Sequence, residues 1–525
     1  MSADLSALPD PPQKLRRLCV VLGDQLDAES AVFDAFDPAQ DALLLTEAAE
    51  EATYLAQHKK RLVLFFAAMR HFALEQAALG RPLIYRRLDG AAPAATLAES
   101  LIRAIRDFDP EEIRVAQPGD HRVLTALEAA ANGAGKPLLA LEDRHFLVSR
   151  ARFADWFRGR KRILLEDFYR AERKRAGWLM TEDGQPVGGA WNFDKDNRKS
   201  FGAEGPGLIA PRPRFEPDPV TREVIAMVRA RFAAAPGAID GFAEAVTRAD
   251  ALQALEDFIA NRLPRFGDHQ DAMATGHVTL NHSRLSTSLN LKLLHPREVC
   301  EAALAAYAAG RAPLNAVEGF VRQILGWREY VRGIYWSLMP AYAQRNGLGA
   351  GETVPAFFWT GETEMACLAD GLGGVMREGY AHHIQRLMVM GLFMMLYGAR
   401  PYAAHEWHMA LYLDAIDWVS LPNVLGMSQH GDEGVVGSKP YAASGAYIDR
   451  MSDHCAGCPY DPKQATGPKA CPFTTLYWSF LERHEDRFKP NMRMRMQLAN
   501  LARKDAEERK TIRQAEAALR RRLTV

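Results

Sequence analysis

Three cysteines near the C-terminal end of the sequence have the spacing of a metal or cluster site. Cys455 and Cys458 form a C-x-x-C motif, which lets one metal ion or cluster take both thiolates, and Cys471 follows after twelve intervening residues. A fourth ligand must come from far away in the sequence, and Cys367 is the natural candidate. Zinc and an iron–sulfur cluster both accept four thiolates, and the proline that follows Cys471 mildly favours the cluster.

The other two cysteines, Cys19 and Cys300, lie in apolar stretches, and we expect them to be buried core residues. A tight trio of cysteines in a long chain favours a metal site over a disulfide framework. The first seventeen residues hold acids and prolines without the apolar run of a secretory signal, and the sequence has no stretch of about eighteen apolar residues. We therefore expect a cytoplasmic protein without a membrane span.

Two adjacent histidines, His382 and His383, are suited to proton transfer, because an imidazole titrates near neutral pH and its pKa shifts easily. Neighbouring residues on a helix point in different directions, so only one of the two can face a given ligand. For an arbitrary His-His pair, packing or surface exposure would be the better explanation.

The elements that position these residues are of two kinds. Up to about residue 145, short apolar runs alternate with helical stretches, and this βαβ rhythm predicts a Rossmann-like parallel sheet flanked by helices. No G-x-G-x-x-G motif follows the first run, so we expect no dinucleotide there. The predicted strands are Leu18–Leu22, Ala42–Thr46, Leu62–Phe66, Leu83–Leu88, Ile113–Ala116 and Leu138–Leu141.

Two carboxylates follow the first two predicted strands. Asp24 lies just after the first strand and Glu47 just after the second. Ligands of doubly wound sheets bind at the carboxyl ends of the strands. From the sequence pattern alone, however, loop solvation or helix capping explains both residues better than a ligand-binding role does.

Strand signals fade beyond residue 145. A mixed connector over residues 146–235 leads into residues 236–525, where apolar residues recur at helical spacing. The expected fold class is therefore α/β plus all-α, with an α/β domain over residues 1–145 and a helical domain over residues 236–525. The chain carries 65 basic and 65 acidic residues, so any nucleic-acid surface must be a local patch. Residues 481–525, with thirteen basic against seven acidic residues, could contact phosphates, although a solvated helix explains them more simply.

Several segments together resemble one family. Ser283–Arg297 is similar to the flavin-phosphate segment of photolyases, where small hydroxyl residues at a helix start offer donors to a pyrophosphate. Trp327–Tyr330 resembles the family's W-R-E-F element, and His382–Arg386 resembles its H-N-x-x-R segment. The order of these segments, and of Asp417–Asn423 before the cysteine trio, is most similar to bacterial iron–sulfur photolyases and cryptochromes, which include prokaryotic (6-4) photolyases.

The resemblance implies three cofactors. It implies a helical domain that holds FAD, and a [4Fe–4S] cluster on Cys367, Cys455, Cys458 and Cys471. It further implies an antenna chromophore, 6,7-dimethyl-8-ribityllumazine, in the α/β domain, with Asp24, Glu47, Glu51 and Tyr54 as contacts. The implied FAD contacts are Ser283, Leu285, Ser286, Thr287, Arg328, Glu329, Arg386 and Asn423.

The activity that the resemblance implies is blue-light repair of (6-4) pyrimidine photoproducts in UV-damaged DNA by a monomer. His383 would then face the lesion and His382 would support it or share its proton. Asp271 would hold a cation such as Mg²⁺ or polarise the lesion, or else is a plain helix-terminal carboxylate, while Tyr441 and Tyr447 would line the lesion pocket. Trp407 and Trp359 match an electron-transfer chain, but His408 stands where relatives often have tyrosine, which puts the middle step in doubt.

Three alternatives remain open from the sequence. A cryptochrome-type light sensor would have the same fold and cofactors and would signal through a partner. A cluster that serves only nucleic-acid binding, as in the large subunit of primases, would need no flavin segment. Repair of cyclobutane dimers is disfavoured because His382 and His383 replace the expected His-Asn pair.

Overall fold

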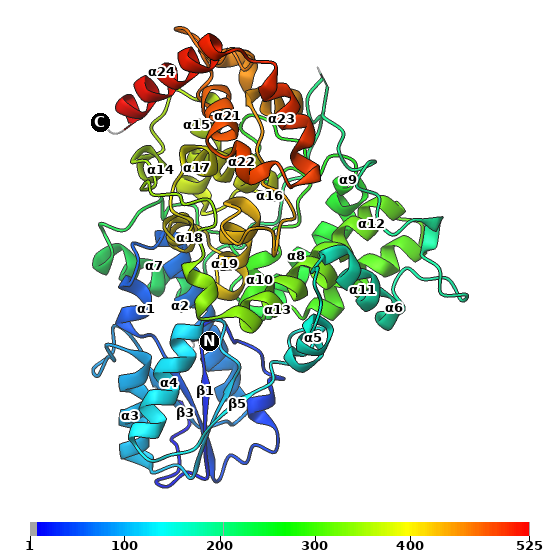
Figure 1. Cartoon of the computed structure of the whole chain (residues 1–525). Coiled ribbons are helices and arrows are strands. Elements are labelled where there is room, and N and C mark those ends of the chain that lie inside the picture. The colour runs from blue at the N-terminus through cyan, green and yellow to red at the C-terminus, as the bar shows by residue number, and fades with distance from the viewer. Residues whose placement is uncertain (1–7, 203, 524–525) are drawn as a thin grey trace.

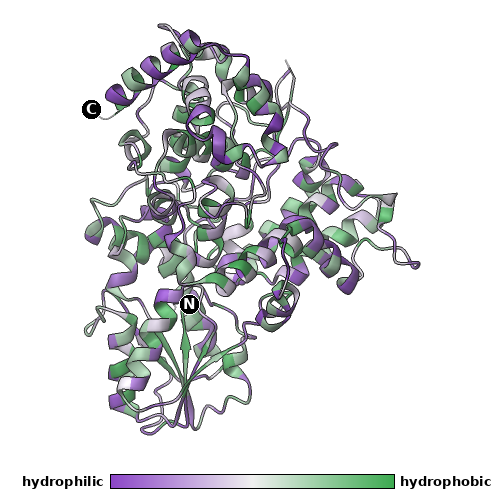
Figure 2. Ribbon diagram, in the orientation of Figure 1, coloured by the Kyte–Doolittle hydropathy of each residue, from purple (hydrophilic) through white to green (hydrophobic). Residues whose placement is uncertain are grey.

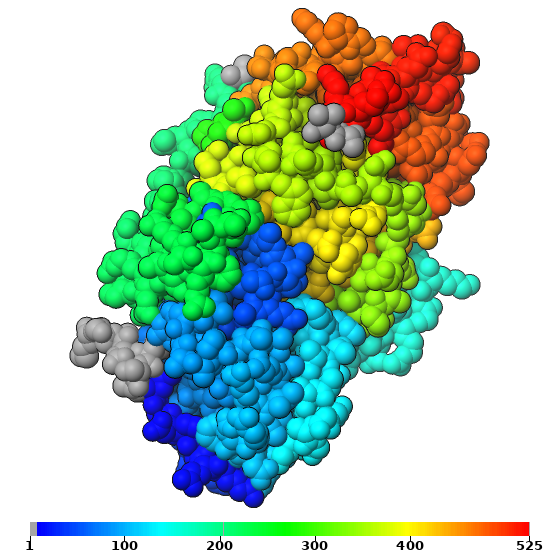
Figure 3. All heavy atoms as spheres, turned by 90° about the vertical axis from the view of Figure 1, so that its left-hand side faces the viewer, coloured from blue at the N-terminus to red at the C-terminus, as the bar shows by residue number. Residues whose placement is uncertain are grey.

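A computed structural model describes residues 8–202 and 204–523 of the chain (Figure 1). Residues 1–7, which belong to the N-terminal segment that was compared above with secretory signals, lie outside this range. Within the described residues, no helix combines the length and the apolar character needed to cross a membrane. The sheet lies at one end of the molecule and the C-terminal helices lie at the other, as the space-filling view also shows (Figure 3).

Five parallel strands form the N-terminal sheet in the order β3-β2-β1-β4-β5, which confirms the predicted parallel α/β arrangement. Because all strands run the same way, their carboxyl ends meet at one edge, where ligands of such sheets bind. The strands are β1 (Arg17–Val21), β2 (Asp41–Thr46), β3 (Leu83–Arg86), β4 (Glu112–Ala116) and β5 (Leu138–Leu141), and the helices between them are α1 (Ala49–Thr53), α2 (Lys59–Ala78), α3 (Leu97–Phe108) and α4 (His121–Gly133).

Strand β1 is apolar on both faces because helices cover both sides of the sheet. Leu18 and Val20 pack with α3 and α4, whereas Cys19 and Val21 pack with α2. This alternation follows the two-residue period of a strand, and Figure 2 shows the strands as hydrophobic. Cys19 is fully buried, as predicted, and its thiol donates to the carbonyl of Val32 at 3.1 Å.

The predicted strand Leu62–Phe66 is wrong, because these residues belong to α2. This helix lies between the sheet and helix α7, so apolar residues such as Leu62, Val63 and Leu64 are buried on several sides. A helix buried all round has no polar face, and a short apolar run within it looks like a buried strand. The helix begins where the ring of His58 accepts a hydrogen bond from the backbone N–H of Lys60 at 3.0 Å.

The connector is not a separate layer, since its helices pack on both neighbouring domains. Helix α7 packs along α2, α6 packs against the turn η4, and α5 packs against α13. The predicted domain boundaries stay predictions. The connector helices are α5 (Arg150–Phe157), α6 (Leu165–Ala176) and α7 (Pro219–Arg231).

The second half of the described chain is helical, as expected. Cys300 is fully buried within it, as predicted. Its helices are α8 (Arg248–Asp257), α9 (Leu263–Phe266), α10 (Ser286–Asn290), α11 (Pro296–Ala308), α12 (Leu314–Val321), α13 (Glu329–Leu338), α14 (Phe357–Thr360), α15 (Ala366–Glu378), α16 (His383–Gln385), α17 (Leu392–Tyr397), α18 (Pro401–Leu411), α19 (Asp417–Leu421), α20 (Gly445–Met451), α21 (Pro472–Arg483), α22 (Glu485–Phe488), α23 (Arg495–Ala502) and α24 (Ala506–Leu523). Wider π-type turns are η3 (Phe258–Arg262), η4 (Arg322–Arg328), η6 (Arg386–Gly391) and η7 (Pro422–Ser428), and 3-10 turns are η1 (Ala31–Phe33), η2 (Val187–Gly189), η5 (Ala341–Gln344), η8 (His454–Gly457) and η9 (Met492–Met494).

A buried ion pair ties the end of the sheet to the helical domain. The ammonium of Lys292 donates to Asp143 at 2.6 Å, and both side chains are almost completely buried. Burial raises the pKa of Asp143, but Lys292, with further contributions from His145 and Arg332, outweighs burial and lowers the pKa from 3.8 to about 2. Because the folded-state pKa lies below the ordinary value, the pair stabilises the fold above pH 3.8, and this contribution is lost as the pH falls towards 2.

Replacement of Lys292 by methionine leaves the buried carboxylate of Asp143 without its ion-pair partner, with the backbone N–H of His145 at 3.1 Å as a remaining donor. We expect Lys292→Met to lower the free energy of unfolding at pH 7 by about 3–5 kcal/mol, measured by urea denaturation. The double variant Lys292→Met/Asp143→Leu removes both charges and should recover most of that loss. A single variant as stable as the wild type would show that the pair does not hold the two domains together.

Candidate functional site

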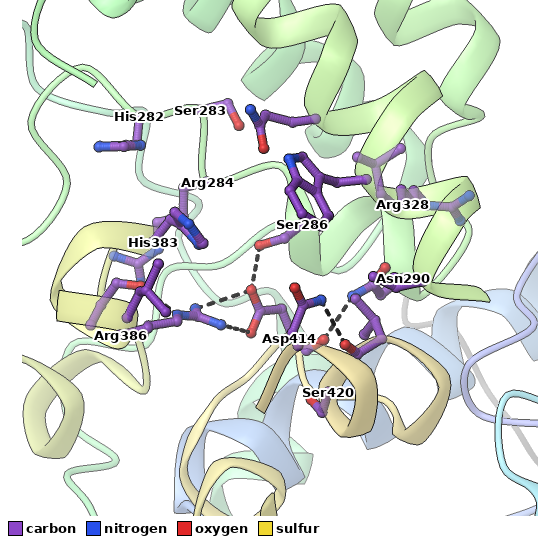
Figure 4. A pocket seen from close by; sticks show the side chains of 18 of the residues that line it. His282, Ser283, Arg284, Ser286, Asn290, Arg328, His383, Arg386, Asp414 and Ser420 are labelled. Atoms are coloured by element: carbon purple, nitrogen blue, oxygen red, sulfur yellow. Dashed lines mark hydrogen bonds and ion pairs between the residues drawn. The ribbon is translucent and has the colours of Figure 1, made fainter. Parts of the chain in front are cut away.

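A cavity of about 320 Å³ opens in the helical domain (Figure 4). Three of its walls come from the π-type turns η4, η6 and η7, and such turns frequently border functional sites. The other walls come from α10 with the residues before it and from α18 with the residues after it. Five of the predicted FAD contacts line this cavity: Ser283, Ser286, Arg328, Arg386 and Asn423.

An ion pair between Arg386 and Asp414 forms one side of the cavity. Two nitrogens of the guanidinium donate to the two carboxylate oxygens at 3.0 and 3.1 Å. The hydroxyl of Ser286 also donates to the carboxylate at 2.6 Å, and Asn290 donates to the backbone carbonyl of Asp414 at 2.7 Å (Figure 4). Burial raises the pKa of Asp414, but Arg386 outweighs it, so the pKa is lowered overall and the carboxylate stays charged.

Three of the predicted FAD contacts do not line the cavity. Leu285 and Thr287 are buried on the packed side of α10 and the residue before it. The carboxylate of Glu329 accepts hydrogen bonds from the backbone N–H of Val148 at 3.0 Å and from Arg328 at 3.1 Å. Glu329 therefore fixes the connector and holds Arg328 in place.

The two adjacent histidines point in different directions. His383 lines the cavity, and its ring is exposed there. Burial by the surrounding protein, and then the charge of Arg386, lower the pKa of His383 to about 4. His382 is buried away from the cavity, where its ring stacks on that of His282 with 4.6 Å between centroids and 11° between planes.

Asp271, Tyr441 and Tyr447 form a separate group outside this cavity. Burial raises the pKa of Asp271 to about 6, although Arg198, with 3.8 Å between Nε and Oδ2, opposes the shift. Burial, and then the charge of Asp271, raise the pKa of Tyr447 to about 12, and Asp271 also raises the pKa of Tyr441. No three possible metal ligands gather among the described residues, so the predicted cation at Asp271 gains no support.

The predicted aromatic chain leads from the interior towards the surface. Trp407 is fully buried, and its indole N–H donates at 3.0 Å to the carbonyl of Phe358, the neighbour of the half-exposed Trp359. His408 lines the first cavity. The ring of Tyr412 lies 5.6 Å from that of Trp407 and 4.8 Å from that of His408, between centroids.

A second cavity of about 120 Å³ lies at the carboxyl ends of the strands, where α18 and α19 meet the sheet. Asp24, Glu47, Glu51 and Tyr54 line it, so the structure brings all four predicted antenna contacts together. Burial raises the pKa of Asp24, which favours its neutral form.

The carboxylate of Glu47 already has hydrogen-bond partners within the protein. It accepts hydrogen bonds from Arg70 at 2.8 and 3.0 Å, from Tyr85 at 2.6 Å and from the backbone N–H of Leu88 at 2.9 Å. Glu51 is likewise paired with Arg122, with two oxygen–nitrogen distances of 2.9 Å. Asp24 and Tyr54 are therefore the predicted residues that are most available to a ligand.

The wall between the sheet and the helical domain needs a glycine at position 119. A Cβ there would lie 2.3 Å from a carboxylate oxygen of Asp24 and 2.7 Å from the side chain of Ile416. The neighbouring Asp120 also lines the second cavity, and burial, followed by the charge of Asp417, raises its pKa to about 6. The second cavity thus holds two acids, Asp24 and Asp120, with raised pKa values.

The four predicted cluster ligands meet although one of them lies far away in the sequence. Cys367, Cys455, Cys458 and Cys471 line one small closed cavity. Burial, and then the other three thiols, raise the pKa of Cys367. Among the described residues no three possible ligands meet the geometry of a single metal ion, so the four thiols are a candidate ligand set by their shared cavity alone.

Sequence reasoning missed Asp414, His282 and Asp120. Asp414 precedes the recognised Asp417–Asn423 run by only three residues, and that closeness is the one available signal. Its role depends on Arg386 and Ser286, which lie 28 and 128 residues away. Asp120 lies just after the fourth strand, so the strand-end rule that pointed to Asp24 and Glu47 could have found it.

Comparison with known proteins identifies the family. A family model described as deoxyribodipyrimidine photo-lyase-related protein matches residues 19–243. A (6-4) photolyase of Agrobacterium fabrum (strain C58) is 46% identical over 510 residues, which cover 97% of this chain and 100% of the relative. The chain belongs to the photolyase/cryptochrome family.

Solved structures of photolyases and cryptochromes share the fold. A bacterial class III photolyase from Agrobacterium tumefaciens has a TM-score of 0.56 at 14% identity, covering 98% of this chain and 100% of the other. A cryptochrome from Synechocystis sp. PCC6803 has a TM-score of 0.54 at 12% identity, covering 98% of this chain and 99% of the other. Both confirm the predicted combination of a parallel sheet and a helical domain.

Proposed function

We propose that this member of the photolyase/cryptochrome family repairs (6-4) pyrimidine photoproducts in UV-damaged DNA under blue light. The observation that carries the proposal is the 46% identity, over nearly the whole chain, to a relative named as a (6-4) photolyase. The cavity with His383 and Arg386 supplies residues suited to that chemistry.

FAD is the cofactor that the family implies, and the residues of the first cavity fit it. The hydroxyl of Ser283, whose proton has no acceptor within the described part of the chain, would donate to the pyrophosphate, and the guanidinium of Arg386 would lie beside the flavin ring. Arg328 carries a buried Nε without a hydrogen-bond partner among the described residues, which is a donor still to be satisfied. When bound and reduced, FAD supplies the electron for repair under blue light.

His383 would transfer the proton that lets the hydroxyl of the lesion return to the neighbouring base. Its ring lines the cavity, where it can exchange a proton with a bound lesion, and its lowered pKa favours the neutral imidazole, which can accept the hydroxyl proton and return it to the base. His382 would support this position from behind through its stack with His282. Asp271, Tyr441 and Tyr447 would contact the DNA around the lesion.

A [4Fe–4S] cluster on Cys367, Cys455, Cys458 and Cys471 is the second cofactor that we propose. Four thiols that line one cavity fit thiolate ligation, and the proline that follows Cys471 favours a cluster over zinc. 6,7-Dimethyl-8-ribityllumazine in the second cavity is the proposed antenna. The neutral form of Asp24 would donate a hydrogen bond to such a ligand, which has many acceptors.

We further propose that Trp407 and Trp359 carry electrons to the flavin and that the protein acts as a cytoplasmic monomer. All six cysteines are free thiols, which fits a reducing compartment. The rings of Trp407, His408 and Tyr412 contact one another, with centroids 5.4 Å, 5.6 Å and 4.8 Å apart for the pairs Trp407–His408, Trp407–Tyr412 and His408–Tyr412. The alternative function is that of a cryptochrome-type light sensor, which the fold shared with a cryptochrome also permits.

A single-lesion repair assay tests the proposed function. An oligonucleotide with one (6-4) photoproduct is mixed with anaerobically reduced protein, and lit and dark samples are compared by chromatography. We expect light-dependent return of the intact bases, and a rate about 10²–10⁴-fold lower in His383→Ala, because the proton donor is lost.

The control for this assay is His382→Phe, which keeps a ring stacked on His282 and should repair at a rate close to that of the wild type. If a preparation that visibly holds reduced flavin repairs no lesion, the protein moves to the sensor class.

The cluster is tested by metal analysis of Cys367→Ser. The wild type should contain roughly four iron atoms and matching acid-labile sulfide per chain, and the variant should lose most of both. Cys300→Ser, which changes a buried thiol outside the cluster cavity, should keep its iron. Zinc in place of iron in the wild type would contradict the cluster.

A further inference from the structure

A short segment near the C-terminus holds two methionines out towards solvent. Met492 and Met496 are 74% and 76% exposed, whereas Met494 between them is fully buried in the core of the helical domain. The 3-10 turn η9 runs directly into α23, so the two exposed methionines lie four residues apart on one continuous segment. They are therefore presented on an anchored backbone (Figure 1).

The segment is fastened to the loop that carries Lys439 and Tyr441. The guanidinium of Arg493 donates to the hydroxyl of Ser438 at 2.6 Å, and Asn491 donates to the carbonyl of Ser438 at 3.2 Å. The side chain of Asn491 also accepts from the backbone N–H of Arg493 at 3.0 Å, which caps the turn.

Positive charge gathers here without neutralisation. Burial, and then the charges of Arg493 and Arg198, lower the pKa of Lys439, so the three cations from three segments are close enough to repel one another. Among the described residues, Lys439 and Arg493 have no acidic partner within 4.0 Å, and Arg198 meets only Asp271, at 3.8 Å. Such a cluster favours a polyanion.

The cations lie beside the wall of the first cavity. Gly437 lies between Tyr441 and Met427: a Cβ there would be 3.6 Å from the tyrosine ring and 3.5 Å from the Cα of Met427. Met427 lines the cavity. A DNA strand held by Lys439 and Arg493 would therefore pass the cavity that receives the lesion.

We propose that Lys439 and Arg493 bind backbone phosphates of damaged duplex DNA, while Met492 and Met496 enter the gap that the flipped lesion leaves in the duplex. The inference rests on the proposed function, since it assumes that a lesion leaves the stack. Proteins that distort DNA often insert apolar side chains, methionine included, where base steps are unstacked. Flipping removes stacking around the lesion, and the methionines replace part of it.

The proposal distinguishes double-stranded from single-stranded substrates. In a duplex, the gap is bounded by stacked base pairs and by unpaired bases on the opposite strand, so an apolar side chain finds a surface to cover. A single strand has no such gap. The methionines should therefore contribute to duplex binding, whereas the two cations should contribute to both.

Equilibrium binding in the dark tests the role of Met492 and Met496. The ligands are duplex and single-stranded oligonucleotides that carry one (6-4) lesion. We expect Met492→Ala/Met496→Ala to weaken duplex binding by about tenfold or more, since burying one such side chain is worth about 1.5–3 kcal/mol and a tenfold change is 1.4 kcal/mol. Binding to the single strand should change less than about threefold. Leu79→Ala, at a 60% exposed residue after α2, is the matched control and should change neither.

The salt dependence of DNA binding tests the role of Arg493. Arg493→Gln should weaken binding to both substrates and should reduce the slope of log affinity against log salt by about 0.9 on the duplex. Arg229→Gln, which changes an exposed arginine paired with Asp240, is the control and should leave the slope unchanged.

The outcomes separate the two proposals. Suppose that the wild type prefers duplex DNA with the lesion over undamaged duplex. If Met492→Ala/Met496→Ala then binds the duplex and the single-stranded lesion substrates as tightly as the wild type does, the proposed role of the two methionines is overturned and the repair function stands. If the wild type shows no preference for the lesion, the repair function itself fails. The altered residues are exposed, and equal melting temperatures confirm that the variants fold.

Discussion

The buried ion pair between Arg386 and Asp414 is the interaction on which the site depends. Two parallel N–H···O bonds fix the guanidinium against the carboxylate, and this geometry is among the strongest that a protein can form. The pair joins the turn that carries His383 to the chain after α18, and Ser286 and Asn290 join α10 to the same aspartate. Loss of one charge would leave the other buried without a partner, at a cost of about 3–5 kcal/mol.

The segment around Asp414 is also the wall between the two cavities. His408, Asp414 and Ser420 line the first cavity, while Ile416 and Asp417 line the second. The N-terminal domain holds the same segment by backbone contacts. Arg61 donates to the carbonyls of residues 412 and 413 at 3.3 and 3.2 Å, and the N–H of residue 418 donates to the carbonyl of residue 119 at 3.0 Å. The two domains therefore share one structural element, and a ligand that orders one face should help to order the other.

Sequence alone gave the parts of this arrangement that depend on local pattern. The short apolar run Leu18–Leu22 predicted β1, and the C-x-x-C spacing predicted that Cys455 and Cys458 share a cavity. The apolar run at 62–66 was misassigned because a helix buried on several sides has the same local pattern as a buried strand. Asp414 had no local signal beyond its closeness to the Asp417–Asn423 run, since its role comes from partners 28 and 128 residues away that only the fold brings together. His282 was missed for the same reason, because it meets His382 across a hundred residues.

The most direct test of this account is to measure ligand affinity in Asp414→Asn, which keeps the shape of the side chain and removes its charge. Dissociation constants for FAD and for 6,7-dimethyl-8-ribityllumazine would be determined for the variant and the wild type. The account predicts that FAD binding weakens by about tenfold or more and that lumazine binding weakens with it, because the residue holds the wall between the two cavities. Unchanged affinity for both ligands in a folded variant would contradict it.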